Sequence, residues 1–214
     1  MKALKEQVST LKVPYIEFMA VNEMDPYKVL ISCILSLRTQ DRTTAAASQR
    51  LFALASTPDA MCRLTIEEIE RAIYPVGFYR VKALNIKSIS ERLVSEFGSV
   101  VPDTIEVLLG LKGVGRKTAN LVVTVAYGKD GICVDTHVHR IVNRWGYVQT
   151  KTPEQTEFAL RDVLPRKYWR GINGLLVSFG QGICRPVSPL CNRCSIRQYC
   201  RDGEERERRG GSAY

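Results

Sequence analysis

The sequence predicts a nearly all-α protein, on three observations. Helix-start patterns recur along the chain, each pairing a capping side chain with a proline or with an acid or amide three residues later. No two alternating apolar stretches are joined by a tight Asn-Gly or Asp-Gly turn. Apolar residues make up 45% and charged residues 25% of the 214 residues, which is typical of a folded globular chain. A chain of this length is expected to form one or two domains without disulfides.

The predicted helices begin at capping residues. Asp25 followed by Pro26 starts an apolar helix that runs through Leu35, and Asp41 is predicted to cap the next helix. Further starts have the same cap chemistry: Thr57-Pro58, Thr65 with Glu68, Asp103 with Glu106, and Thr152-Pro153 with Gln155.

A glycine-rich turn separates two predicted helices, one over about 103–110 and one over about 116–126. Gly113 and Gly115 allow a sharp turn with positive φ and leave room for a ligand. The amide groups at the start of the second helix carry a partial positive charge, and Arg116 adds a full one. The segment therefore favours a phosphate site, with a plain helix–turn–helix corner as the alternative.

Lys117 lies in the first turn of that second helix, where the helix dipole disfavours a cation. The dipole and the neighbouring Arg116 are expected to favour its neutral form, which an amine nucleophile needs. A solvated surface lysine is the alternative interpretation.

Asp135 precedes an apolar-periodic helix and is predicted to cap it with an ionised carboxylate. His137 and His139 are the only two histidines of the chain. Because they are two residues apart, they face different sides of the helix, and a paired histidine metal site is not expected.

A cluster of four cysteines lies near the C-terminus with the spacing Cys-x₆-Cys-x₂-Cys-x₅-Cys: Cys184, Cys191, Cys194 and Cys200. No secretory signal precedes the chain's first helix, so we expect a reducing, cytoplasmic location in which a metal centre explains the cluster. Only one pair has the tight spacing usual for structural zinc, so an iron–sulfur cluster is favoured and zinc stays open.

The charge of the chain is strongly basic, with 31 Lys and Arg against 22 Asp and Glu and a formal net charge of +9. The charged tail over 201–214 is predicted to be disordered and has balanced charge, so the excess lies upstream. A basic surface of this kind leaves open a polyanionic partner or an anionic membrane surface. The apolar stretches are too short to span a bilayer.

The order of three segments resembles endonuclease III, a family of helix-hairpin-helix DNA glycosylases: Leu111–Lys117, Val134–His137 and the four-cysteine loop. The resemblance implies two helical domains that flank a DNA-binding cleft. A six-helix domain with the hairpin would span 23–131, and an iron–sulfur domain would combine 1–22 with 132–200.

The resemblance also implies an activity. The protein would be a monomeric, bifunctional DNA glycosylase and abasic-site lyase of base excision repair, acting on oxidised pyrimidines in double-stranded DNA. Lys117 would be the nucleophile that forms a Schiff base and nicks the strand by β-elimination. Asp135 would stabilise positive charge on the sugar or deprotonate Lys117. The four cysteines would bind a [4Fe–4S] cluster.

Several residues match the family's DNA contacts: Arg38, Phe78, Gly113, Val114, Gly115, Arg116, His137 and Arg185. The hairpin amides would hold a phosphate, and Phe78 would be a wedge between bases. Arg38 occupies the place where the family usually carries a glutamine that fills the gap of the flipped base. This departure leaves the preferred lesion and opposite base open.

Two alternatives remain beside this interpretation. A monofunctional mismatch or adenine glycosylase is disfavoured, because Lys117 is present and Cys33 stands where the adenine-removing relatives have a glutamate. A non-catalytic DNA-binding iron–sulfur protein would use the same hairpin and cysteines only for docking or redox sensing.

Overall fold

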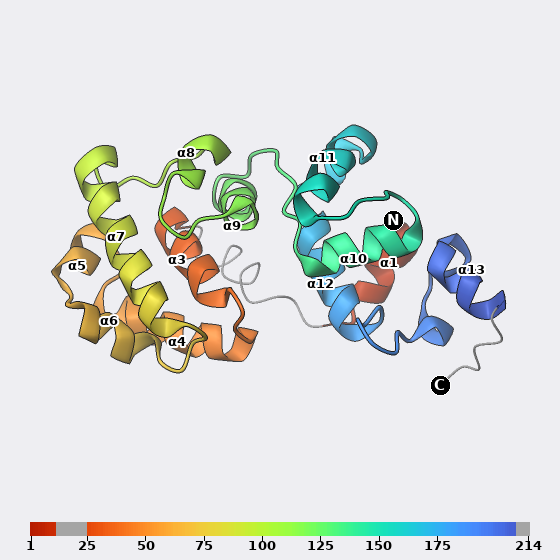
Figure 1. Cartoon of the computed structure of the whole chain (residues 1–214), viewed down its shortest axis with the longest axis horizontal. Helices are drawn as coiled ribbons and strands as arrows, with labels where there is room; N and C mark the ends of the chain where they lie inside the picture. Colours follow the sequence, from red (N-terminus) through yellow and green to blue (C-terminus); the bar gives the residue numbers. More distant parts are fainter. Residues whose placement is uncertain (12–24, 209–214) are drawn as a thin grey trace. The chain divides into compact units, whose positions relative to one another are not determined.

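The structure, a computed structural model, describes residues 1–11 and 25–208 (Figure 1). Within these ranges every regular element is a helix, which confirms the all-α prediction. The described residues form two compact units: a central unit of residues 25–131, and a terminal unit of residues 1–11 together with 132–208. The predicted domain boundary between 22 and 23 lies outside the described residues. No helix in the described ranges is both long and apolar enough to cross a membrane.

The central unit is built around α3, which is buried along most of its length and contacts α4, α7, α9 and η1 (Figure 1). Its helices are α3 (Pro26–Ser36), α4 (Asp41–Leu54), α5 (Pro58–Arg63), α6 (Ile66–Ile73), α7 (Tyr79–Phe97), α8 (Ile105–Leu109), α9 (Arg116–Leu121) and the π-helical turn η1 (Val122–Ala126).

Three predicted helix starts in this unit are confirmed. Asp25 accepts hydrogen bonds from two amides in the first turn of α3. The Thr57 hydroxyl accepts from one amide of α5, that of Ala60. Thr65 and Glu68 make both halves of a capping box at α6. Each cap satisfies amides that have no partner within the helix, which fixes where the helix begins.

Two other predicted starts are wrong. Asp41 is the first residue of α4 and not its cap. Asp103 does not cap α8, because its carboxylate binds Lys129 Nζ at 2.6 Å and the helix begins later, at Ile105. The local spacing predicted that the Asp103 carboxylate would cap a helix, but this carboxylate forms an ion pair with Lys129 instead.

The helix after the glycine turn also departs from its prediction. It is α-helical only to Leu121 and continues as a π-helical turn over Val122–Ala126. The hydroxyl of Thr124 donates to the carbonyl of Asn120 at 2.8 Å. This side-chain hydrogen bond competes with the regular backbone ladder, and such wide turns recur at functional sites.

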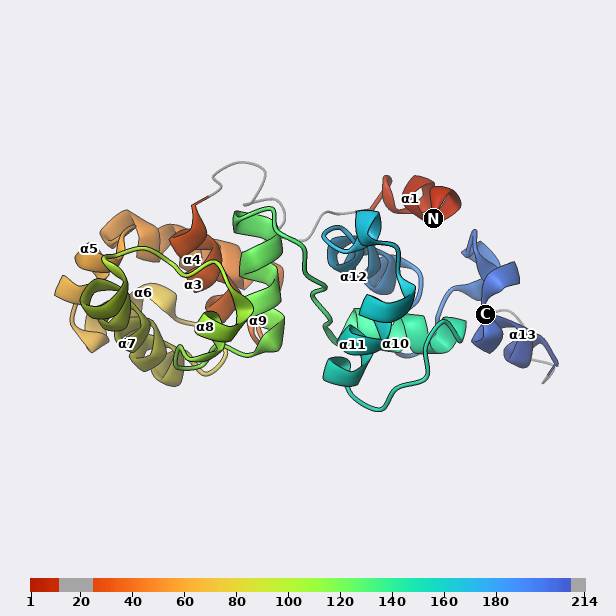
Figure 2. The same ribbon diagram turned by 90° about the horizontal axis from the view of Figure 1, so that it is seen from above.

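The terminal unit joins the start of the chain to its second half. Its helices are α1 (Lys2–Val8), α10 (Thr136–Trp145), α11 (Pro153–Val163), η2 (Arg166–Tyr168), α12 (Ile172–Gly182), η3 (Cys191–Arg193), η4 (Arg197–Tyr199) and α13 (Arg201–Arg208). Figure 2 shows α10, α11 and α12 packed closely together. Leu4 of α1 and Phe179 of α12 are buried in the same apolar core, so α1 is part of this unit.

Two details of the terminal unit differ from the sequence prediction. Thr152 caps α11, but Gln155 accepts from the amide of Lys151, so the predicted capping box is only half formed. Helix α13 lies in the segment that was predicted to be disordered. Its charges pair one turn apart, as between Arg201 and Glu205, which favours a helix over an extended tail. Residues 209–214 of that tail lie outside the described ranges.

Candidate active site

The glycine turn between α8 and α9 uses its two glycines differently. Gly113 has φ +80°, and a Cβ there would lie 2.4 Å from the side-chain nitrogen of Asn85. Gly115 has φ −99°, so the predicted positive φ holds for Gly113 alone. A Cβ on Gly115 would meet no atom within 4 Å. The turn therefore requires a glycine at position 113. At position 115 the absence of a side chain leaves the space beside the backbone open.

The amide of Val114 is used inside the hairpin. Its N–H donates to the carbonyl of Leu111 at 3.1 Å, and its side chain is buried. Of the three amides expected to hold a phosphate, this one turns inward. Gly113 and Gly115 are both exposed at the tip of the turn, just before the positive end of α9.

Lys117 lies in the first turn of α9, directly after Arg116, and both residues are half-buried. The charge of Lys117 acts on Cys33 of α3. Burial raises the pKa of the Cys33 thiol to about 12, and the Lys117 ammonium opposes that rise. Lys117 is therefore close enough to α3 for its charge to act on a buried thiol.

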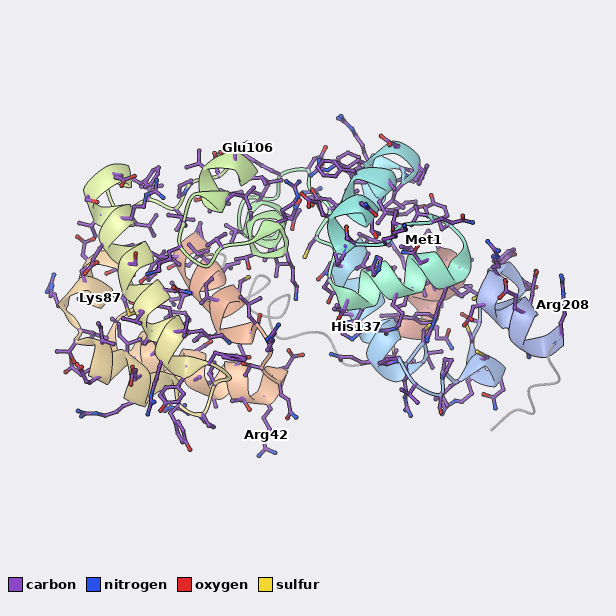
Figure 3. The ribbon with its side chains drawn as sticks, in the orientation of Figure 1. Met1, Arg42, Lys87, Glu106, His137 and Arg208 are labelled. Carbon is purple, nitrogen blue, oxygen red and sulfur yellow. The ribbon has the colours of Figure 1, made fainter. Side chains whose placement is uncertain are left out.

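Asp135 caps α10, as predicted. One carboxylate oxygen accepts from the amides of His137 and Val138 at 2.8 and 2.9 Å. The other lies 3.2 Å from Nδ1 of His137, a residue labelled in Figure 3. Only 9% of the Asp135 side chain is exposed. The carboxylate is thus held in one orientation by the start of its own helix.

The predicted site residue His137 therefore contacts Asp135 directly, which spacing alone did not indicate. Its ring packs against α12, where a Cβ on Gly180 would lie 2.8 Å from the ring and 2.9 Å from Arg140 Nη2. Arg140 donates to the carbonyl of Cys184 at 2.9 Å. Sequence reasoning missed both Gly180 and Arg140, although Arg140 follows Asp135 within the same predicted helix.

The four cysteines of the C-terminal loop line one pocket, together with apolar residues and the charged residues Arg144, Arg197 and Asp202. Arg144 Nη1 lies 3.5 Å from Cys184 Sγ and also donates to the carbonyl of Arg185. The side chain of Arg185 itself is exposed, as a DNA contact requires. Burial raises the pKa values of Cys194 and Cys200.

The donor set of this pocket fits an iron–sulfur cluster. Four thiols facing one space match the ligand number of such a cluster. In the described part of the chain, no three His, Cys, Asp or Glu side chains lie close enough together to hold a single ion.

Two further predicted site residues, Arg38 and Phe78, lie together in the central unit. The Arg38 guanidinium lies 5.5 Å from the centre of the Phe78 ring. Both residues have positive φ, 53° and 58°, which is uncommon for side chains of this size. Phe78 is 62% exposed and is therefore not an ordinary core residue.

Comparisons with known proteins agree with this geometry. Residues 31–166 match the HhH-GPD superfamily of base excision DNA repair proteins. The chain is 49% identical to endonuclease III of Thermotoga maritima, over 83% of this chain and 84% of that protein. It is 46% identical to an endonuclease III-like protein of Bos taurus, over 81% of this chain but only 58% of that longer protein.

A similar solved structure is a trapped covalent intermediate of endonuclease III with DNA. It matches with a TM-score of 0.81 and 35% identity, over 86% of each chain. The family match covers the hairpin and the Asp135 helix, and the fold agrees over most of the chain. The chain belongs to the HhH-GPD superfamily and, within it, to the endonuclease III family.

Proposed function

We propose that this protein is a bifunctional DNA glycosylase and abasic-site lyase of base excision repair, which removes oxidised pyrimidines from double-stranded DNA. The observation that carries the proposal is Lys117, a half-buried amine in the first turn of the hairpin's second helix. The relative that was solved as a trapped covalent DNA intermediate supports a nucleophile in this family.

In the proposed reaction, the target nucleotide is first turned out of the duplex. The neutral amine of Lys117 attacks C1′ of the sugar, and the base leaves with the electron pair of the glycosidic bond. Loss of a proton from the amine and opening of the sugar ring give a Schiff base. Removal of a C2′ proton then breaks the bond to the 3′ phosphate, and water releases the enzyme.

Asp135 is proposed to act on the same nucleotide as Lys117. Its carboxylate is fixed by two backbone amides and faces His137, so it needs no reorganisation when positive charge develops on the sugar. Alternatively, it accepts the proton that Lys117 must lose. Both roles require a negatively charged carboxylate, so an asparagine at position 135 could perform neither.

The DNA contacts are proposed as follows. The amides of Gly113 and Gly115, with Arg116, hold one phosphate, whereas Val114 anchors the hairpin in the core. Arg38 and Phe78 enter the duplex beside the vacated position. Two more contacts come from the terminal unit, His137 near the lesion and Arg185 at a phosphate.

We also propose that the cysteine loop binds a [4Fe–4S] cluster through Cys184, Cys191, Cys194 and Cys200. When bound, the cluster supplies a rigid cross-link that holds the loop and α13 to the core of the terminal unit. Arg144 lines the same pocket and donates to loop carbonyls, so it shapes the segment that presents Arg185.

The proposal is tested by trapping. The protein is incubated with a duplex that contains one abasic site, in the presence of borohydride, which reduces a Schiff base to a stable adduct. We expect a covalent adduct for the wild type and a loss of about a thousandfold for Lys117→Gln, because the nucleophile is removed. Wild-type protein that is folded and binds the duplex but yields no adduct would contradict the lyase activity and leave a DNA-binding module.

A further inference from the structure

Lys82 on α7 is a buried lysine with three neutral partners. The residue is only 5% exposed. Its Nζ donates to the carbonyls of Leu35 and Leu37 at 2.8 and 2.5 Å, and to the Thr39 hydroxyl at 3.2 Å. Burial lowers the pKa of Lys82 to about 8, because the charged form is poorly solvated. A charge in this place costs stability, which suggests that it serves another purpose.

The first two partners lie at the end of α3. Leu35 belongs to its last turn and Leu37 is its C-terminal cap. Carbonyls at a helix C-terminus lack partners within the helix and favour a cation. Lys82 therefore fixes the point where the chain leaves α3 and enters the loop that leads to α4. This loop, residues 37–40, contains Arg38 and is called the Arg38 loop.

The third partner, Thr39, connects the Arg38 loop to the loop between α6 and α7. This second loop, residues 74–78, is called the Phe78 loop. The Thr39 hydroxyl accepts from both Lys82 Nζ and the amide of Gly77, each at 3.2 Å. A Cβ on Gly77 would lie 2.7 Å from the carbonyl oxygen of Arg38, so the two backbones touch there. The amide of Lys82 donates to the carbonyl of Phe78 at 3.0 Å. The Lys82 side chain thus contacts the Arg38 loop directly and the Phe78 loop through the Thr39 hydroxyl.

Both loops hold their tip residue in a strained conformation. Arg38 and Phe78 each have positive φ, a conformation that is unfavourable for such side chains and persists only when surrounding contacts impose it. Resting on the proposed function, we infer that Lys82 is a positioning residue for base extrusion, which locks the Arg38 and Phe78 loops together so that both side chains enter the duplex as one rigid wedge.

Lys87 provides a matched control on the same helix (Figure 3). Its Nζ donates to the carbonyls of Cys62 and Leu64, at the end of α5. It therefore has the same cap chemistry as Lys82, with an added ion pair to Glu91 at 3.9 Å, and bonds to neither the Arg38 loop nor the Phe78 loop. A general loss of stability would affect both lysine variants, whereas a loss of wedge geometry would affect Lys82 alone.

The experiment compares Lys82→Met with Lys87→Met on a duplex that carries one oxidised pyrimidine beside 2-aminopurine, whose fluorescence rises when the stack opens. At saturating DNA, we expect Lys82→Met to lose most of the fluorescence rise and about tenfold to a hundredfold in single-turnover excision, because the wedge is misplaced. Lys87→Met should keep both. Trapping at a preformed abasic site should change little in either variant.

Two outcomes would overturn the inference. Equal behaviour of the two lysine variants on the oxidised pyrimidine would mean that Lys82 is merely structural. Should Lys82→Met not fold, Thr39→Val removes the link to Gly77 with less disturbance, and full base opening in that variant would also contradict the inference. Absence of wild-type trapping would instead contradict the proposed function.

Discussion

At the scale of single residues, Asp135 combines a structural and a proposed chemical task in one carboxylate. Asparagine caps helices as well as aspartate does, so Asp135→Asn should change the free energy of unfolding by no more than about 1 kcal/mol. Excision should fall by about a hundredfold or more, since the amide neither stabilises positive charge nor accepts a proton. Single-turnover excision and denaturant unfolding measure the two effects separately.

Asp25 is the control for this substitution, because it caps α3 with the same two-amide geometry. Asp25→Asn should leave excision near the wild-type rate. DNA affinity, measured by fluorescence anisotropy, should decline much less than excision in Asp135→Asn. If affinity and excision declined equally, Asp135 would be a cap and nothing more.

At the scale of helices, the sequence predicted several helix starts correctly, and the wrong predictions have a physical cause. Caps such as Thr57 and Thr65 depend on neighbours within three residues, so spacing identified them. Asp103 was misassigned because Lys129, far along the chain, binds its carboxylate. The contact between Arg38 and Phe78 and the anchoring by Lys82 likewise depend on tertiary packing, which local patterns do not contain.

The hairpin offers a prediction at the same scale. Gly113→Ala must adopt a left-handed conformation and displace Asn85, so it should lower the free energy of unfolding by about 1–3 kcal/mol. Gly115→Ala has space for its Cβ and should cost about 1 kcal/mol or less, from the cap position alone. It should nevertheless weaken DNA binding, because the new methyl group occupies the space proposed for the phosphate. Denaturant unfolding of a Gly113→Ala variant as stable as wild type would contradict this account of the turn.

For the whole molecule, the order of motifs was more informative than any one of them. The hairpin, Asp135 and the cysteine loop each allowed a plain structural interpretation. Their succession along the chain indicated the family that the comparisons then identified. The preferred lesion could not be predicted, because the positive φ of Arg38 and its contact with the Phe78 ring depend on tertiary packing.

The cysteine loop gives the prediction that concerns the terminal unit as a whole. Cys184 and Cys194 pack against the apolar core of that unit, so loss of a bound group should affect more than the loop. Purified wild-type protein should contain iron and absorb visible light. Cys194→Ser removes one of four thiolates and should reduce iron to below about a tenth of the wild-type content, with a lower thermal midpoint. Cys62→Ser, a half-buried cysteine of the central unit, should keep its iron. Metal analysis that found zinc in place of iron would overturn the cluster assignment, and full iron content in Cys194→Ser would exclude this residue as a ligand.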